Sequence, residues 1–115
     1  SESRKESRKK FSYYMQLTDA VTRKLVGHLA DISTGGFKLD SEQPIPVDTE
    51  YRFHLALTGE VASKSYMVFQ ARSKWCQSDP IDPFVYNVGF HIIEMTPEDR
   101  TIFTRVVERY GQHAR

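Results

Sequence analysis

Short runs in which apolar residues alternate with polar ones recur along this chain of 115 residues. A period of two places the apolar side chains on one face of an extended strand, and turn-forming residues separate the runs. The segments expected to form strands are Phe11–Leu17, Lys24–Ile32, Phe37–Leu39, Tyr51–Leu57, 67–75 and Phe84–Ile93. Six or seven short antiparallel strands with regularly spaced turns are typical of a small barrel, and closure would also remove the exposed sheet edges.

One amphipathic helix is expected after the last strand. Thr96 is a good N-cap, Pro97 suits the first helical position, and Glu98 and Asp99 complement the helix dipole. A single apolar stripe comprises Ile102, Phe103, Val106, Val107 and Tyr110. Gly111 is expected to end the helix, and the stripe is expected to cover the open end of the barrel.

The alternation also assigns faces to individual residues. In the second strand it places Leu29 and Asp31 on one face and Ile32 on the other. In the segment 67–75 it places Trp75 on the same face as Ser73, so Trp75 is expected in the core together with Tyr13 and Tyr51. A stacking platform of Trp75 and exposed tyrosines, as on a barrel that binds single-stranded nucleic acid, is the alternative.

The composition narrows the class of protein. A formal net charge of only +1 provides no global basic field for duplex nucleic acid. The single cysteine, Cys76, excludes an internal disulfide and fits a reducing compartment, so a cytoplasmic location is expected. No apolar run in the sequence approaches the length that spans a bilayer.

An enzyme or a metal site finds little support in the sequence. No nucleophile motif surrounds Cys76. His28, His54 and His91 lie on separate expected strands without the ligand spacing of a zinc site, so we expect neither catalysis nor a bound metal. Asp79 and Asp82 lie in a proline-rich turn and are expected to be structural.

The segment Asp31–Gly36, between the second and third expected strands, combines a carboxylate, a hydroxyl and two glycines. Asp31 and Ser33 are two residues apart, so on extended backbone they face the same side. Gly35 and Gly36 can take a positive φ and leave the backbone bare. Such a group can recognise a small polar ligand, but on its own a tight hairpin capped by Asp31 and Ser33 is the favoured interpretation.

Residues 1–10 are dense in charge and have no apolar periodicity, so we expect a flexible arm there. One alternative is a solvated tail. The other is a basic patch that touches acidic lipid or RNA, and Glu2 and Glu6 weaken its lipid and RNA versions because they interrupt the basic run. Arg4 and Arg8 lie four apart on this arm. A guanidinium matches phosphate oxygens or the O6/N7 edge of guanine and stacks on flat rings, so two of them can close over an anionic purine ligand.

The order of these motifs, RxxxR at Arg4–Arg8 and then DxSxxG at Asp31–Gly36, resembles the signature of the PilZ domain, the bacterial receptor for cyclic di-GMP. Lys74-Trp75 and Asn87-Val88-Gly89-Phe90 are also similar to segments of that family. The resemblance implies one domain: an arm over 1–10, a six-stranded antiparallel β-barrel over 11–95 and a C-terminal α-helix over 96–111.

The same resemblance implies a role for each site residue, with cyclic di-GMP as ligand and no cofactor. Arg4 and Arg8 would meet the guanine edges and the phosphates, and Asp31 would accept the guanine N1–H and N2–H. Ser33 would donate and accept, and the two glycines would admit the ligand close to the backbone. The residues of this binding set are Arg4, Arg8, Asp31, Ser33, Gly35 and Gly36, with Lys5 and Lys9 adding attraction without geometry.

The expected function is therefore a bacterial, cytoplasmic cyclic di-GMP receptor that is not an enzyme and binds neither DNA nor RNA. The ligand would order the N-terminal arm on the barrel and so signal to a downstream protein partner, in motility or biofilm regulation. The oligomeric state stays open. The main alternative is a PilZ-like protein-interaction module that does not bind nucleotide.

Overall fold

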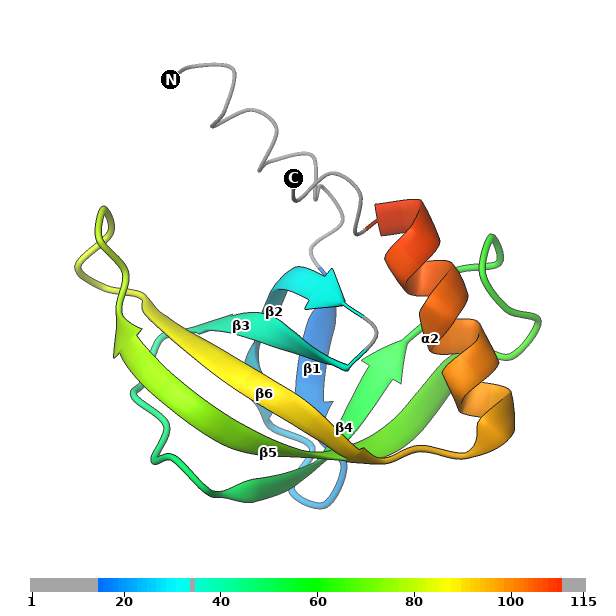
Figure 1. Ribbon diagram of the computed structural model, residues 1–115, viewed down its shortest axis with the longest axis horizontal. Coiled ribbons are helices and arrows are strands. Elements are labelled where there is room, and N and C mark those ends of the chain that lie inside the picture. The colour runs from blue at the N-terminus through cyan, green and yellow to red at the C-terminus, as the bar shows by residue number, and fades with distance from the viewer. Residues whose placement is uncertain (1–14, 34, 111–115) are drawn as a thin grey trace.

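Six antiparallel strands close into a barrel in the computed structural model, which describes residues 15–33 and 35–110 (Figure 1). The strands are β1 (Gln16–Asp19), β2 (Leu25–Ser33), β3 (Gly36–Ser41), β4 (Glu50–Ala56), β5 (Tyr66–Ser78) and β6 (Tyr86–Glu94). Around the barrel their order is β1-β2-β3-β6-β5-β4, and pairing of β1 with β4 completes the closure. The predicted six-stranded antiparallel barrel is thus confirmed.

Four phenylalanine rings fill the interior. Phe37, Phe53, Phe69 and Phe90 come from four different strands, and none is more than 6% exposed. Phe90 lies 5.2 Å from Phe37 in a stacked pair and 5.1 Å from Phe53 edge to face, measured between ring centroids. These are the separations that aromatic pairs prefer, so the cluster ties β3, β4, β5 and β6 together from inside.

Most of the predicted alternation is confirmed, with small differences in strand bounds. Met15 and Leu17 point inward from the beginning of the described chain, and residues 11–14 lie outside the described part. Thr18 and Asp19 belong to β1, so the strand extends two residues beyond the predicted end at Leu17. Tyr51 is half-buried and stacks on Phe53 at 5.3 Å; burial raises the pKa of its phenol, and Asp19 raises it further.

Two β-bulges overturn the predicted faces of two residues. The pairing of β2 with β3 shifts between Leu29 and Asp31, so Ile32 joins Leu29 in the core and Asp31 turns outward. The pairing of β5 with β6 shifts between Ser73 and Trp75, so Ser73 is buried while Trp75 is 41% exposed. The expectation of a buried Trp75 was wrong because one extra residue in a strand reverses every face beyond it.

The predicted helix is confirmed as α2 (Pro97–Tyr110), which lies against the end of the barrel beside the β4–β5 loop (Figure 1). Its apolar side is anchored by Phe103, which is 2% exposed and 6.1 Å from the Phe69 ring. Arg105 donates to the backbone oxygen of Val61 in the β4–β5 loop at 3.0 Å. No helix within residues 15–33 and 35–110 is both long enough and apolar enough to cross a membrane.

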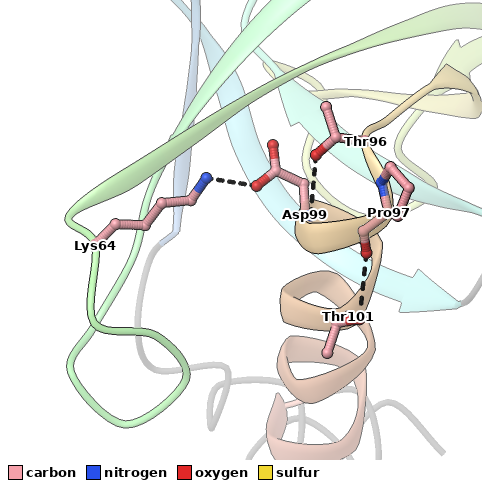
Figure 2. Close-up of polar contacts among 5 residues, drawn as sticks. All are labelled: Lys64, Thr96, Pro97, Asp99 and Thr101. Carbon is pink, nitrogen blue, oxygen red and sulfur yellow. Dashed lines mark hydrogen bonds and ion pairs between the residues drawn. The ribbon is translucent and has the colours of Figure 1, made fainter.

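Polar contacts fix the first turn of α2 (Figure 2). The backbone N–H of Asp99 donates to Thr96 Oγ1 at 3.1 Å, which confirms Thr96 as the N-cap. The Asp99 carboxylate, almost fully buried, accepts from Lys64 Nζ at 2.6 Å. This hydrogen bond raises the pKa of Lys64 and joins the beginning of the helix to the β4–β5 loop.

We predict that Thr96→Ala lowers the free energy of unfolding by about 1 kcal/mol, because the Asp99 N–H loses its acceptor. The matched control is Thr101→Ala. Thr101 Oγ1 only donates back to the Pro97 carbonyl at 3.2 Å, so its loss is expected to be neutral. Urea unfolding monitored by circular dichroism measures both, and equal effects of the two variants would contradict the N-cap assignment.

Candidate functional site

A cleft of about 420 Å³ lies on the outer face of the barrel, across β2, β3, β6 and β5. It brings together four of the residues predicted from the sequence, namely Asp31, Ser33, Gly35 and Gly36. The other predicted residues (Arg4, Lys5, Arg8 and Lys9) lie outside the described part of the chain. Its remaining outward-facing side chains come from Lys38, Lys74, Trp75 and His91, and the buried Gly89 also lines it.

One cross-strand row runs through the cleft. Asp31 pairs with Lys38, Lys38 with Gly89, and Gly89 with Trp75, so the row passes directly from β2 through β3 and β6 to β5. Neighbouring strands lie about 4.8 Å apart, so the row spans about 15 Å. A carboxylate therefore stands at one end of the row, a cation beside it, and an indole ring at the other end.

Both ends of this row face outward because of the two bulges. The shift between Leu29 and Asp31 brings the Asp31 carboxylate to the outer face, and the shift between Ser73 and Trp75 does the same for the indole. Bulges reorient a side chain at the place where they occur and are frequent next to binding sites. The cleft thus depends on irregularities in two strands that flank a regular β3–β6 pair.

The Trp75 ring can approach the backbone of β6 closely because residue 89 is glycine. A Cβ atom added at Gly89 would overlap the Nε1 and Cε2 atoms of the indole. The ring therefore packs directly on the backbone of β6, and 41% of the Trp75 surface stays open to solvent.

The turn at the edge of the cleft is partly self-capping. Ser33 Oγ donates to the Gly36 carbonyl at 3.3 Å, as the turn interpretation expected, yet the Ser33 side chain remains exposed. The Gly35 carbonyl accepts from the Ile92 N–H at 3.1 Å, which fixes the turn against β6. Ser33 can thus support the turn and still offer lone pairs to a ligand.

Gly36 is required for a reason other than a positive φ, since its φ is not in that range. A Cβ atom added there would overlap the backbone oxygen of Phe90, because β3 and β6 approach closely at this point. At Gly35 an added Cβ would meet no atom within 4 Å. The two glycines of the motif therefore differ, and Gly36 carries the steric constraint.

The electrostatics of the cleft are mixed but mainly cationic. Asp31 supplies the carboxylate among the described lining residues, whereas Lys38 and Lys74 supply positive charges and His91 an imidazole ring. Asp31 is half-buried, and its carboxylate makes no hydrogen bond or ion pair with another described residue, so the carboxylate oxygens can accept from a ligand. This set suits an anionic ligand that also presents N–H donors and a flat ring.

Sequence analysis missed the contributions of Lys38, Trp75 and His91. The signal for Lys38 was present, because it stands between the inward residues Phe37 and Leu39. Trp75 was noticed but assigned to the core, since the bulge beside it leaves no mark in the apolar period. Asp79 and Asp82 are structural as expected, because their carboxylates accept backbone N–H groups of the β5–β6 turn.

Comparison with protein families gives a match over nearly the whole chain. The family model of the PilZ domain matches residues 2–109. No curated protein matches the chain.

We predict that Gly36→Ala lowers the free energy of unfolding by about 1–3 kcal/mol, because the new methyl group would force β3 away from Phe90. Gly35→Ala is the matched control, one residue away in the same turn, and is expected to be neutral or slightly stabilising. Urea midpoints decide between them. If the control is destabilised as much as Gly36→Ala, close packing on β6 is not the constraint.

Proposed function

The chain belongs to the PilZ domain family, the cyclic di-GMP receptors of bacteria, and on this premise we propose that it binds cyclic di-GMP in the cleft of β2, β3, β6 and β5. PilZ domains bind and do not catalyse. The volume of the cleft, about 420 Å³, lies within the range of small-molecule sites. The observation that carries the proposal is the cross-strand row from Asp31 through Lys38 and Gly89 to Trp75.

Asp31 is proposed to recognise guanine. Its carboxylate accepts hydrogen bonds only, and guanine presents N1–H and N2–H donors side by side on one edge. Ser33 lies on the same outer side two residues on, where its hydroxyl can meet a further polar atom of the ligand. Lys38, paired with Asp31 across the strands, is placed to meet a phosphate oxygen next to the recognised base.

Trp75 is proposed to stack on a base. The residue is 41% exposed, its ring contacts the backbone at Gly89, and it stands at the other end of the row from Asp31. Stacking of a base on an aromatic side chain contributes about 1–3 kcal/mol and needs little reorganisation when the ring is already held in place.

Arg4 and Arg8 are proposed to close the site from the arm. Both lie outside the described residues, so their role rests on the match of the family to residues 2–109 and on their chemistry. A guanidinium can pair with the O6/N7 edge of guanine in a bidentate way and can also neutralise a phosphate. Lys5 and Lys9 would add attraction for the dianionic ligand.

The free energies of the proposed contacts are large enough for micromolar affinity. A hydrogen bond to a charged group contributes about 1.5–3 kcal/mol net. Four such contacts approach the roughly 8 kcal/mol that a micromolar dissociation constant requires, before costs are subtracted. Ordering a residue of the arm costs about 1–2 kcal/mol, so only a few arm residues are expected to become fixed.

The proposed mechanism is a switch in the bacterial cytoplasm. The ligand joins the arm to the barrel wall at the cleft, and the surface presented to a downstream protein changes accordingly. A process such as motility or biofilm formation would be regulated through that protein.

Calorimetric titration with cyclic di-GMP tests the proposal. We expect wild-type binding in the micromolar range or tighter, no binding of GTP, and a loss of about 1–3 kcal/mol in Arg8→Ala, the contribution of one bidentate guanine contact. Arg100→Ala, which removes an exposed arginine from α2, is the matched control and should bind as wild type does.

Two results would contradict the proposal. Wild-type protein that gives no heat and no thermal stabilisation with excess cyclic di-GMP does not bind it, and the interaction module without nucleotide binding then becomes the leading function. Equal losses in Arg8→Ala and Arg100→Ala would mean that only general charge attraction operates.

The role of Trp75 is tested separately by Trp75→Ala, which we expect to weaken cyclic di-GMP binding by about 1–3 kcal/mol. Tyr66→Ala is the control, because Tyr66 is an aromatic residue of the same strand and is 49% exposed. It lies away from the cleft and stacks on His54, with 4.5 Å between the ring centroids. The same calorimetric titration measures both variants. Unchanged affinity in Trp75→Ala would remove the indole from the binding site.

A further inference from the structure

The tip of the β5–β6 hairpin presents two large apolar side chains to solvent. Ile81 is 72% exposed and Phe84 is 79% exposed. They lie three residues apart in the connection between Ser78 and Tyr86, which extends from the side of the barrel opposite α2 (Figure 1). Exposed apolar groups that gather at a projecting tip indicate a contact surface more than single exposed residues do.

The hairpin tip is held in one conformation. The Asp79 carboxylate accepts from the N–H groups of Ile81 at 2.9 Å and Asp82 at 2.8 Å, and Asp82 Oδ1 accepts from the Phe84 N–H at 3.0 Å. The Asp79 N–H donates to the Val85 carbonyl at 2.9 Å, closing the turn. Because these bonds already order the backbone, docking of the two apolar side chains would cost little further entropy.

The charge of the tip limits what it can meet. Residues 75–90 contain Asp79 and Asp82 but no lysine, arginine or histidine. An acidic tip is repelled by nucleic acid and by anionic lipid headgroups. It therefore fits a protein surface on which an apolar or aromatic area is bordered by cations.

Such a surface exists on the chain itself. The cleft offers the exposed indole of Trp75, bordered by Lys38, Lys74 and His91. Two of the four strands that form the cleft, β5 and β6, also carry the tip, and β5 runs from Trp75 to Ser78 over about 10 Å. The β5–β6 ribbon thus carries an aromatic, cationic area and, farther along, an apolar, acidic tip.

We infer that two copies of the chain associate through a two-fold axis, with the hairpin tip of each copy seated in the cleft of the other. A two-fold interface requires a self-complementary patch in which each element meets its complement on the partner, and this ribbon provides both elements. Phe84 and Ile81 would cover the Trp75 indole, and Asp82 would face Lys74.

If the hairpin tip binds in the partner's cleft, it competes with cyclic di-GMP for that cleft. This consequence rests on the proposed function. Ligand binding is then expected to release the dimer. Self-association itself requires only the cleft and the tip, so the two proposals can fail independently.

Sedimentation equilibrium of the full chain over a concentration series tests the inference. We expect the wild-type mass to rise from 13.3 kDa towards twice that value. The double variant I81S/F84S should remain at the mass of one chain. Val21→Ser is the matched control, because Val21 is 76% exposed on the β1–β2 connection, and it should associate as wild type does.

Exchanging the charges of Asp82 and Lys74 tests whether the hairpin tip binds in the partner's cleft. Asp82→Lys and Lys74→Glu should each abolish the dimer, and the combination D82K/K74E should restore it, which a disturbed turn alone would not do. Circular dichroism checks that each variant is folded. Restoration supports the inference, and failure to restore overturns it.

Other results would also overturn the inference. These are a wild-type mass that stays at 13.3 kDa throughout the series, a dimer that I81S/F84S leaves intact, or a dimer that persists when calorimetry shows the chain saturated with cyclic di-GMP. If calorimetry instead shows no ligand binding, the proposed function fails, and the charge exchange alone decides whether the tip occupies the cleft.

Discussion

The packing of four phenylalanine rings inside a six-stranded barrel constrains everything else in this structure. Phe37, Phe53, Phe69 and Phe90 come from four strands, so a slip of one residue in any of them would move a ring from the interior to solvent. The side chains that face the interior therefore cannot change their orientation, and irregular orientations occur on the outer face. The cleft obeys this constraint, since the outward turn of Asp31 and of Trp75 is made by bulges that leave the rings in place.

Much of the fold follows from the sequence because its signals are local. Alternation located β2 to β6 and overlapped β1 at Gln16 and Leu17, and Thr96 with Pro97 located the beginning of α2. The orientation of Asp31 and Trp75 did not follow, because a bulge depends on how a strand pairs with a distant neighbour. The alternation of apolar residues along one strand does not show how that strand pairs with its neighbour. Asp31 and Gly36 were identified as site residues by their motif, whereas Lys38 and His91 became part of the site only when β3 was seen to pair with β6.

The two ends of the molecule differ in how they are held. At one end Lys64, Arg105 and the buried Asp99 tie α2 to the β4–β5 loop, so that end is built for stability. At the other end the β5–β6 hairpin is ordered by its own turn and leaves Ile81 and Phe84 in water. A rigid turn holds this apolar pair in water. Covering the pair with another surface is favourable, because it removes apolar area from water. The β5–β6 ribbon carries both a wall of the cleft and the hairpin, so it is the part of the fold through which the proposed ligand and the proposed protein contact would be coupled.

The position of Trp75 has a practical consequence. It is the single tryptophan of the chain, and its ring rests on the backbone at Gly89 in the wall of the cleft. Its emission therefore reports the polarity of one defined place and not an average over the fold. A base laid on the indole and a phenylalanine from a second copy would change that environment differently, by quenching in the first case and by exclusion of water in the second. The chain thus carries its own optical probe of what occupies the cleft.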